Sequence, residues 1–304
     1  MLRNYEINNL NTLLKKNGVI DYSLSEKLTK HISLISKWHI KYGSSLGGKS
    51  DNAYSLFFPP NIINNINSDI PIIGFILRKL VGFIKLTWSY LIKCYLIHII
   101  EKEIPIRILV KNYFQSKKSS LTKIDIDCYL NKPSNKPVLD WHRDAALSNN
   151  SEKKNFKKFN TNTIKLFLFL DPNEDKLVVN KDITKYPSLA VVPACSDAVR
   201  CIDYLIINKK IPGTGNNHTL EEMKKNSEYI LSKSNELISN KNFQDLENFL
   251  NQINVLENIS ENKFDIEGKP SKMILFDDRN LHRGSPTGKN YRMVLRLMFR
   301  SKIF

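Results

Sequence analysis

Hydrophobic positions recur with two different spacings along the chain, and the change between them separates helical from extended parts. In residues 23–41 apolar side chains recur at helical spacing behind a capping box made by Ser23 and Glu26. Residues 70–100 also predict a helical region. From 124 to 131 apolar and polar residues alternate one by one, which predicts a β-strand.

The second half of the chain predicts more strands around a helical insertion. The further strands are expected at 138–144, 163–170, 188–192, 272–278 and 291–299. Residues 197–262 interrupt them with a helical pattern that includes a second capping box, Thr219 with Glu222. This order of helices, strands, helices and strands predicts an antiparallel β core with helices outside it, and not an alternating parallel sheet.

Composition and charge narrow the class of protein. The 304 residues are 41% hydrophobic and 25% charged, which is typical of a globular chain. The net charge of +16 indicates either an anionic partner or the Asn-, Ile- and Lys-rich bias of an AT-rich genome, and the scattered lysines favour the second interpretation. The four cysteines have no disulfide or zinc spacing, so we expect reduced thiols. The polar start predicts no secretory signal, and we expect a cytoplasmic protein.

The apolar segment 70–100 requires a membrane test. Four basic residues interrupt it, so no uncharged run approaches the roughly 18 residues of a transmembrane helix. We therefore expect no transmembrane span and a buried or half-buried helix. A basic amphipathic segment in peripheral contact with a membrane is the alternative.

Two sequence motifs indicate other functions, but their surroundings do not support them. Residues 43–50 (GSSLGGKS) match the P-loop pattern, yet a helical segment precedes them and Pro59-Pro60 follows, so we expect a loop. A P-loop-type nucleotide-binding protein stays as an alternative function. His142-Arg143-Asp144 with Asn149 matches a kinase catalytic loop, but the other kinase motifs are missing.

A third motif predicts a metal site. His142 and Asp144 end an extended segment, and residues i and i+2 of a strand point to the same face. His282 follows another apolar strand and supplies a third ligand. Two histidines and one carboxylate form a facial triad that leaves positions of Fe(II) open. Arg292 lies ten residues after His282, and its planar guanidinium suits a carboxylate.

With these residues the chain resembles the phytanoyl-CoA dioxygenase-like (PhyH) group of Fe(II)/2-oxoglutarate oxygenases. The resemblance rests on Trp141-His142-Arg143-Asp144, IKLFLFLD (164–171), SLAVVPACS (188–196) and the segment 269–299. The chain departs from the group at Ala194-Cys195-Ser196, where Gly-Ser-His is frequent. It also has Gly284 where the group often has serine, and Ser285 follows one place later. Asp144 is retained, whereas related halogenases have a small residue there.

The resemblance implies a mainly β fold with flanking helices, a double-stranded β-helix or jelly roll. It implies one domain over 1–304, with helical support in 1–118, the core in 120–196 and 267–300, and the 197–262 insertion as a lid. The implied iron ligands are His142, Asp144 and His282.

The resemblance also implies a co-substrate site. Arg292 would pair with 2-oxoglutarate. Ser285 is a further candidate, and Arg296 on the same strand face is the rival of Arg292. Trp141, Asp277 and Tyr129 are expected behind the ligands or on the substrate side.

The implied reaction uses O2 to hydroxylate an unactivated C–H bond, with release of succinate and CO2. The expected substrate is a small molecule or a carrier- or CoA-linked group, with an anionic compound among the candidates. We do not expect nucleic acid as a partner, because no aromatic-rich base-flipping loop accompanies the triad. A basic, non-catalytic protein that binds membrane or nucleic acid is the remaining alternative.

Overall fold

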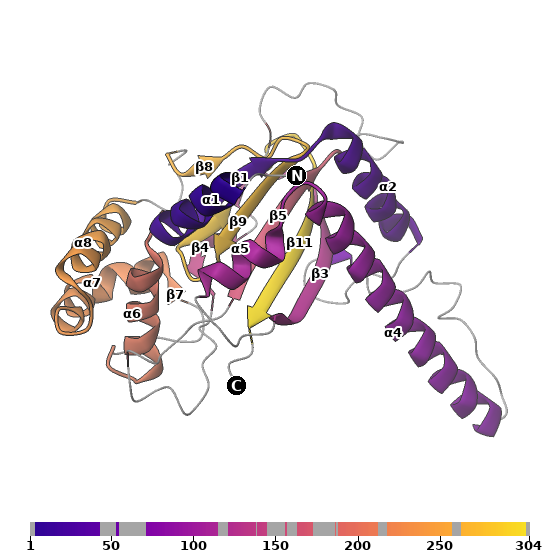
Figure 1. Ribbon diagram of the computed structural model, residues 1–304, viewed down its shortest axis with the longest axis horizontal. Coiled ribbons are helices and arrows are strands. Elements are labelled where there is room, and N and C mark those ends of the chain that lie inside the picture. Colours follow the sequence, from indigo (N-terminus) through magenta and orange to yellow (C-terminus); the bar gives the residue numbers. More distant parts are fainter. Residues whose placement is uncertain are drawn as a thin grey trace.

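The computed structural model describes residues 4–42, 53–54, 71–114, 121–137, 139–144, 156, 163–172, 186, 188–211, 218–256 and 263–301. Within these ranges the chain forms two antiparallel β-sheets with helices on their outer faces (Figure 1). Apolar side chains from both sheets share one buried cluster, so the sheets face each other. The structure thus confirms the predicted mainly β fold with flanking helices.

The larger sheet has six strands and the smaller has five. In spatial order the larger sheet contains β1 (Val19–Ser23), β9 (Lys272–Asp277), β5 (Thr163–Leu170), β11 (Arg292–Ser301), β3 (Leu121–Asn131) and β2 (Ala53–Tyr54). The smaller sheet contains β7 (His218–Thr219), β4 (Leu139–Arg143), β10 (His282–Gly284), β6 (Leu189–Val191) and β8 (Asp265–Ile266). Strands distant in sequence are neighbours in both sheets, as in a jelly roll.

Alternation along the strands of the larger sheet sorts side chains between two environments. On β5, Leu166 and Leu168 join the cluster beneath the helices, whereas Lys165 and Phe167 line the space between the sheets. On β11, Leu295 packs outward while Arg296 points inward. Successive residues of a strand point to opposite faces, so the same strands build both the core and the cavity.

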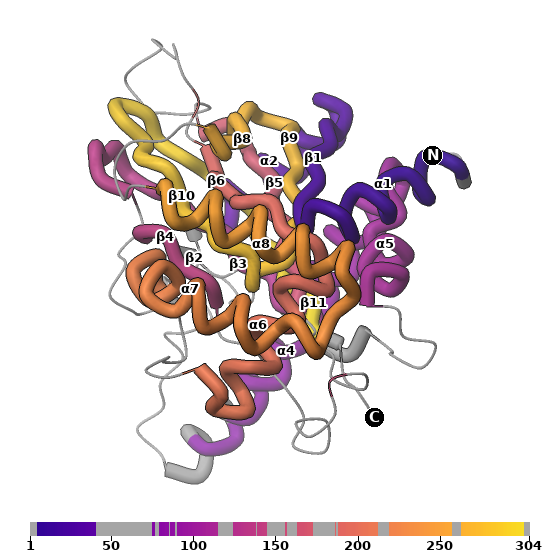
Figure 2. Tube along the Cα trace, turned by 90° about the vertical axis from the view of Figure 1, so that its left-hand side faces the viewer, coloured from indigo at the N-terminus to yellow at the C-terminus, as the bar shows by residue number. Residues whose placement is uncertain are grey.

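Two groups of helices cover the outer faces of the sheets. The larger sheet packs against α1 (Asn4–Asn17), α2 (Glu26–Tyr42), the C-terminal end of α4 (Pro71–Glu101) and α5 (Ile106–Tyr113). The predicted insertion forms α6 (Ser196–Ile207), α7 (Leu220–Ser234) and α8 (Asn240–Asn254), which Figure 2 shows in front of the smaller sheet. Their apolar faces share one buried cluster with outward-facing residues of that sheet, such as Trp141 and Ala190.

The described helices of the insertion support the smaller sheet from outside. None of their described residues lines the cavity between the sheets. The capping box of Thr219 and Glu222 is present at the start of α7, as predicted. The role of this insertion as a lid stays a prediction.

The N-terminal capping box is different from the prediction. Ser23 ends β1, and the helix begins three residues later at Glu26. Ser25 has the capping role, because its Oγ accepts from the Leu28 N–H at 3.3 Å. The β1 strand and α1 were not predicted, and neither was the three-residue strand β10.

The P-loop candidate, residues 43–50, lies outside the described residues, as does Asn149 of the kinase-like motif. The segment that precedes residues 43–50 is nevertheless described. The helix α2 runs to Tyr42, so a helix stands where a P-loop requires a strand.

The long helix α4 is more exposed than the sequence predicted. Its C-terminal end is buried through Leu96, Ile97, Ile99 and Ile100, and Figure 1 shows the rest extending away from the sheets. By length and composition one stretch, Lys79–Glu101, could cross a membrane, and 12% of its most apolar part is buried. Among the described side chains of α4, the expected burial or half-burial is found at the C-terminal end and on the side that faces α2.

Candidate metal centre

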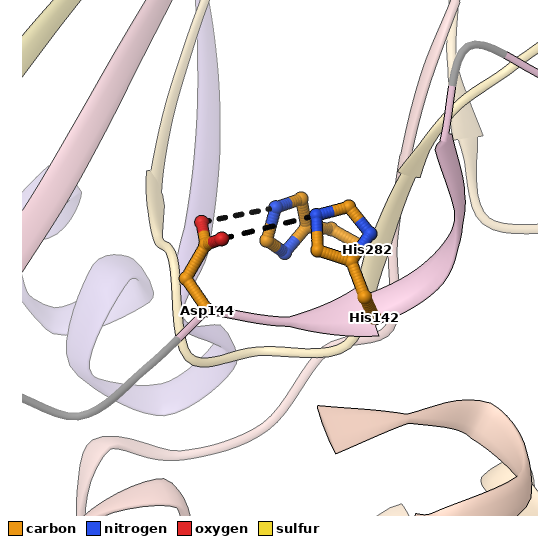
Figure 3. Close-up of side chains that lie close together, drawn as sticks. All are labelled: His142, Asp144 and His282. Carbon is orange, nitrogen blue, oxygen red and sulfur yellow. Dashed lines mark ion pairs between the residues drawn. The ribbon is translucent and has the colours of Figure 1, made fainter. Parts of the chain in front are cut away.

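Two histidines and one aspartate come together where β4 meets β10 (Figure 3). His142 lies on β4, His282 begins β10, and the two residues are paired across the antiparallel ladder. Asp144 directly follows β4, and its backbone N–H donates to the Asp278 carbonyl at 3.1 Å. The ligand atoms of the three side chains lie within 4.8 Å of one another, so they could hold one metal ion.

Backbone carbonyls fix the orientation of both imidazoles. The Nδ1 atom of His142 lies 2.7 Å from the Asp140 carbonyl oxygen, and that of His282 lies 2.8 Å from the Asn280 carbonyl oxygen. A carbonyl oxygen can only accept, so each Nδ1 carries the proton and donates. Both Nε2 atoms then present a lone pair towards Asp144, at 3.9 Å for His142 and 3.6 Å for His282. Metal-binding histidines typically donate a hydrogen bond from the ring nitrogen that does not bind the metal.

The electrostatic surroundings keep two of the ligands in the form that binds a cation. Burial, together with Lys165 and His142, lowers the pKa of His282 to about 3, so this imidazole is neutral at neutral pH. Burial raises the pKa of Asp144, but Lys165 and the two histidines together lower it below its ordinary value. A neutral imidazole and an ionised carboxylate are the protonation states that metal ligation requires.

Lys165 is part of the site and was not predicted from the sequence. Its Nζ donates to Asp144 Oδ2 and lies 3.9 Å from Asp278 Oδ2. Burial raises the pKa of Asp278 to about 8 despite this lysine. The available signal was its position, because Lys165 is the one charged residue in the otherwise apolar strand β5.

A cavity of about 320 Å³ lies between the sheets, with the triad in its wall. Its apolar lining consists of Leu139, Phe167, Phe169, Leu189 and Val294. Besides the triad, its polar lining consists of Tyr129, Asn131, Lys165, Arg292 and Arg296. An apolar pocket of this size with a few convergent polar groups is typical of a small-molecule site.

Arg292 is a buried cation on the wall of this cavity. Its side chain donates to Asn131 Oδ1 at 3.0 Å, to the Ser188 carbonyl at 2.8 Å and to the Ser285 carbonyl at 3.1 Å. Within the described part of the chain, no carboxylate forms an ion pair with it. Burial lowers its pKa to about 10, so it stays charged at neutral pH. The fixed guanidinium therefore offers a binding site for an anion.

The glycine at position 284 gives this guanidinium its space. A Cβ atom built on Gly284 would lie 2.8 Å from Arg292 Nη2. A serine at position 284 would push the arginine aside. Ser285 contributes its backbone carbonyl to Arg292, but its hydroxyl donates to Asp265 Oδ1 at 2.7 Å.

The rival cation, Arg296, lines the same cavity but is already paired. Its guanidinium donates to Asp127 Oδ2 and lies 4.8 Å from the Tyr129 ring centroid. The Tyr129 hydroxyl is 3.5 Å from the same carboxylate. Arg296 therefore has less need of an external anion than Arg292.

Trp141, which was expected behind the ligands or on the substrate side, does not line the cavity. Its parity on β4 is opposite to that of His142, so it points outward into the cluster beneath the insertion. The guanidinium of Arg283 lies 4.8 Å from the centroid of its ring.

Asp277 belongs to a buried ionic cluster and does not line the cavity. It accepts from Arg279 Nε at 2.6 Å and from the Tyr113 hydroxyl at 2.6 Å. Asp203 of α6 completes the cluster, with its two oxygens 2.7 Å from Arg143 Nη2 and 3.3 Å from Arg279 Nη1. This cluster connects the insertion to the loop that precedes His282.

A scan of protein-family models finds no match to this chain, and neither does a search of curated proteins. Among solved structures, the chain is similar to the crystal structure of EvdMO1, with 12% identity, a TM-score of 0.41 and coverage of 97% of this chain and 50% of that one. The chain thus spans about half the length of that protein.

Two further similar structures are described as 2-oxoglutarate enzymes or complexes. SnoN, a non-heme alpha ketoglutarate dependent epimerase from nogalamycin biosynthesis, has 7% identity and a TM-score of 0.44, with coverage of 98% and 84% of the two chains. EvdO2 from Micromonospora carbonacea var. aurantiaca, complexed with 2-oxoglutarate, has 10% identity and a TM-score of 0.40, with coverage of 99% and 92%. At these identities and TM-scores we assign no function from the similarity, and the geometry described above has to carry the proposal.

Proposed function

We propose that this chain is a non-heme Fe(II)- and 2-oxoglutarate-dependent oxygenase of the phytanoyl-CoA dioxygenase-like type. One observation carries the proposal: a buried arginine without a carboxylate partner among the described residues lines the same cavity as a His-Asp-His triad. A triad alone suits several metals. A triad with a nearby anchor for a carboxylate suits a metal that shares its coordination with an anionic co-substrate.

The donor set of the site fits iron. Two imidazole Nε2 atoms and one carboxylate oxygen lie close enough together in the cavity wall to hold one ion, and a triad of this kind would leave coordination positions of Fe(II) open. Three protein ligands with an open face also occur in catalytic zinc sites, so the triad does not discriminate between these metals. The position of Arg292 favours iron. This arginine can bind the far carboxylate of a co-substrate that also binds the metal, and a hydrolytic zinc site requires no such co-substrate.

The residues of the chain divide the work of the proposed reaction. Bound Fe(II), 2-oxoglutarate and O2 would supply the oxidation of a substrate C–H bond, with succinate and CO2 as products. His142, Asp144 and His282 would hold the metal, and Arg292 would orient the co-substrate by its far carboxylate. Phe167, Phe169 and Val294, among the apolar lining, exclude water from the reacting atoms.

The substrate is proposed to be a small molecule or a carrier- or CoA-linked group that reaches this cavity. The apolar wall accommodates a hydrocarbon portion, while Tyr129 and Arg296 offer polar contacts at another part of the lining. Hydroxylation is the proposed outcome. Retention of Asp144 as a ligand supports it, because the carboxylate fills the place that a halide would need.

The test is anaerobic addition of Fe(II) and then 2-oxoglutarate to the purified protein, followed by visible absorption. We expect a weak charge-transfer band that appears only with both additions. His282→Ala should abolish the band, whereas His98→Ala, an exposed histidine of α4, should retain it. Tight zinc binding without any 2-oxoglutarate-dependent band would contradict the proposal and favour a hydrolytic metal site.

A further inference from the structure

The helix α4 carries a surface that no part of the described chain covers. Its exposed apolar side chains include Phe83 and Leu86, which are 67% and 74% exposed. The exposed apolar surface of α4 consists of Phe75, Ile76, Leu80, Phe83, Leu86, Tyr90 and Leu91. Large apolar surfaces on soluble proteins usually mark a site of contact with a protein or a membrane.

The opposite side of the same helix is fixed to the body of the protein. Trp88 donates from Nε1 to His39 Nε2 at 3.1 Å, and its ring lies 5.8 Å from that of Trp38 on α2. At the C-terminal end, Leu96 and Ile100 are fully buried in the main core. The helix is therefore held in place, while none of the described residues covers its apolar surface.

The charge pattern of α4 selects the partner. Residues 70–100 contain four basic residues and no acidic residue, in a chain of net charge +16. Two of these cations lie beside exposed aromatic rings, with Lys79 Nζ 5.5 Å from the Phe75 centroid and Lys93 Nζ 5.9 Å from that of Tyr90. Long basic side chains next to aromatic ones are typical of helices at the boundary between acyl chains and headgroups.

We propose that α4 binds the surface of a bilayer that contains anionic phospholipids, and lies in the interface with its apolar surface inserted. A spanning orientation would place several of the four basic residues in hydrocarbon and would pull Leu96 and Ile100 out of the core. Pairing with α4 of a second copy would bring together two segments 70–100, each with four basic residues and no acidic residue. An anionic bilayer satisfies both the apolar and the basic side chains.

Vesicle flotation of the full chain tests this proposal. We compare vesicles of phosphatidylcholine alone with vesicles of phosphatidylcholine and phosphatidylglycerol. The protein should float with the anionic vesicles, and high salt should release it because ionic attraction is screened. Equal flotation with both lipids would overturn the role of charge, and retention in high salt would overturn the interfacial orientation.

Matched variants locate the surface. The double variant Phe83→Ser/Leu86→Ser should lower the partition coefficient between water and vesicles by about tenfold or more. The reason is that both large apolar side chains stabilise the bound state when they are buried in the bilayer. Tyr5→Ser/Val255→Ser changes two side chains, on α1 and directly after α8, that are 69% and 72% exposed, and this variant should bind like the wild type. Circular dichroism and 2-oxoglutarate binding, which do not depend on this surface, verify the fold of every variant.

Charge and self-association are tested in the same way. Lys79→Glu/Lys93→Glu should abolish flotation with anionic vesicles, whereas Lys225→Glu/Lys241→Glu on α7 and α8, with the same change in net charge, should retain most of it. Equal loss in both pairs would indicate a general effect of net charge and overturn the assignment to α4. A different outcome is a dimer in sedimentation that Phe83→Ser/Leu86→Ser dissociates, together with no binding to vesicles. This result would overturn the bilayer proposal and assign the surface to contact with a second copy of the chain.

Discussion

Arg292→Ala removes the one feature that turns a metal triad into a proposed 2-oxoglutarate site. The arginine is 7% exposed, and three hydrogen bonds to Asn131, Ser188 and Ser285 hold its guanidinium against the cavity. Because the rest of the site stays intact, we expect the variant to keep iron and to lose affinity for the co-substrate.

The magnitude follows from the burial of the pair. Removing one partner of a buried charge pair costs about 2–5 kcal/mol. At roughly 1.4 kcal/mol per factor of ten, the dissociation constant of 2-oxoglutarate should rise about 30-fold to several thousand-fold. Arg292→Lys should restore part of the affinity, since an ammonium group replaces the charge but not the planar fork.

Anaerobic titration of the Fe(II)-loaded protein with 2-oxoglutarate measures this loss, and Arg296→Ala is the internal control. Arg296 lies on the same face of β11, but Asp127 already neutralises it, so its removal should weaken the co-substrate much less. A larger effect of Arg296→Ala would place the anchor four residues further along the strand. If neither variant weakens 2-oxoglutarate, the proposed co-substrate is wrong.

Three further predictions test the surroundings of the site. Lys165→Met removes the cation that pairs with Asp144 and competes with a metal for this carboxylate, so a metal titration should show about tenfold tighter binding. Weaker binding would mean that the lysine positions the carboxylate. Asp203→Ala leaves the buried Arg143 without its carboxylate and should lower the free energy of unfolding in urea by about 3–5 kcal/mol, whereas a loss near zero would show that the cluster is not stabilising. A thiol reagent should react with one cysteine, the exposed Cys94, in the native protein and with four after denaturation, because burial raises the pKa of the other three; rapid reaction of more than one native thiol would contradict the packing of the core.

The sequence was sufficient for the parts of the site that depend on strand periodicity. The spacing of His142 and Asp144 predicted that both point to one face, and the structure places them together with His282. The same rule could have excluded Trp141 from the cavity, because its side chain points to the opposite face of the strand from His142. The strand 163–170 was predicted with its correct bounds, because the run is apolar and bounded by polar residues.

Features that depend on the order of strands in space could not be predicted in this way. Arg292 and Arg296 share one strand face, and only their neighbours on other strands and loops distinguish them: Asp127 of β3 pairs with one, while carbonyls hold the other. The single charge on β5 marks Lys165 as unusual, but its partner Asp144 is known only once β5 is placed opposite β4. The strand β10 was missed because three residues show no periodicity.

The insertion fixes which face of β4 the ligands occupy. A shift by one residue would turn His142 away from the cavity, because side chains alternate along a strand. Two contacts of the insertion oppose this shift: Trp141 packs in its apolar cluster, and Arg143 pairs with Asp203 of α6. The short strand β7 adds a ladder contact in which Thr219 is the partner of His142. The insertion therefore holds the register of the strand that carries His142 and leads into Asp144, so a change in the packing of the insertion would alter the metal site from outside the cavity.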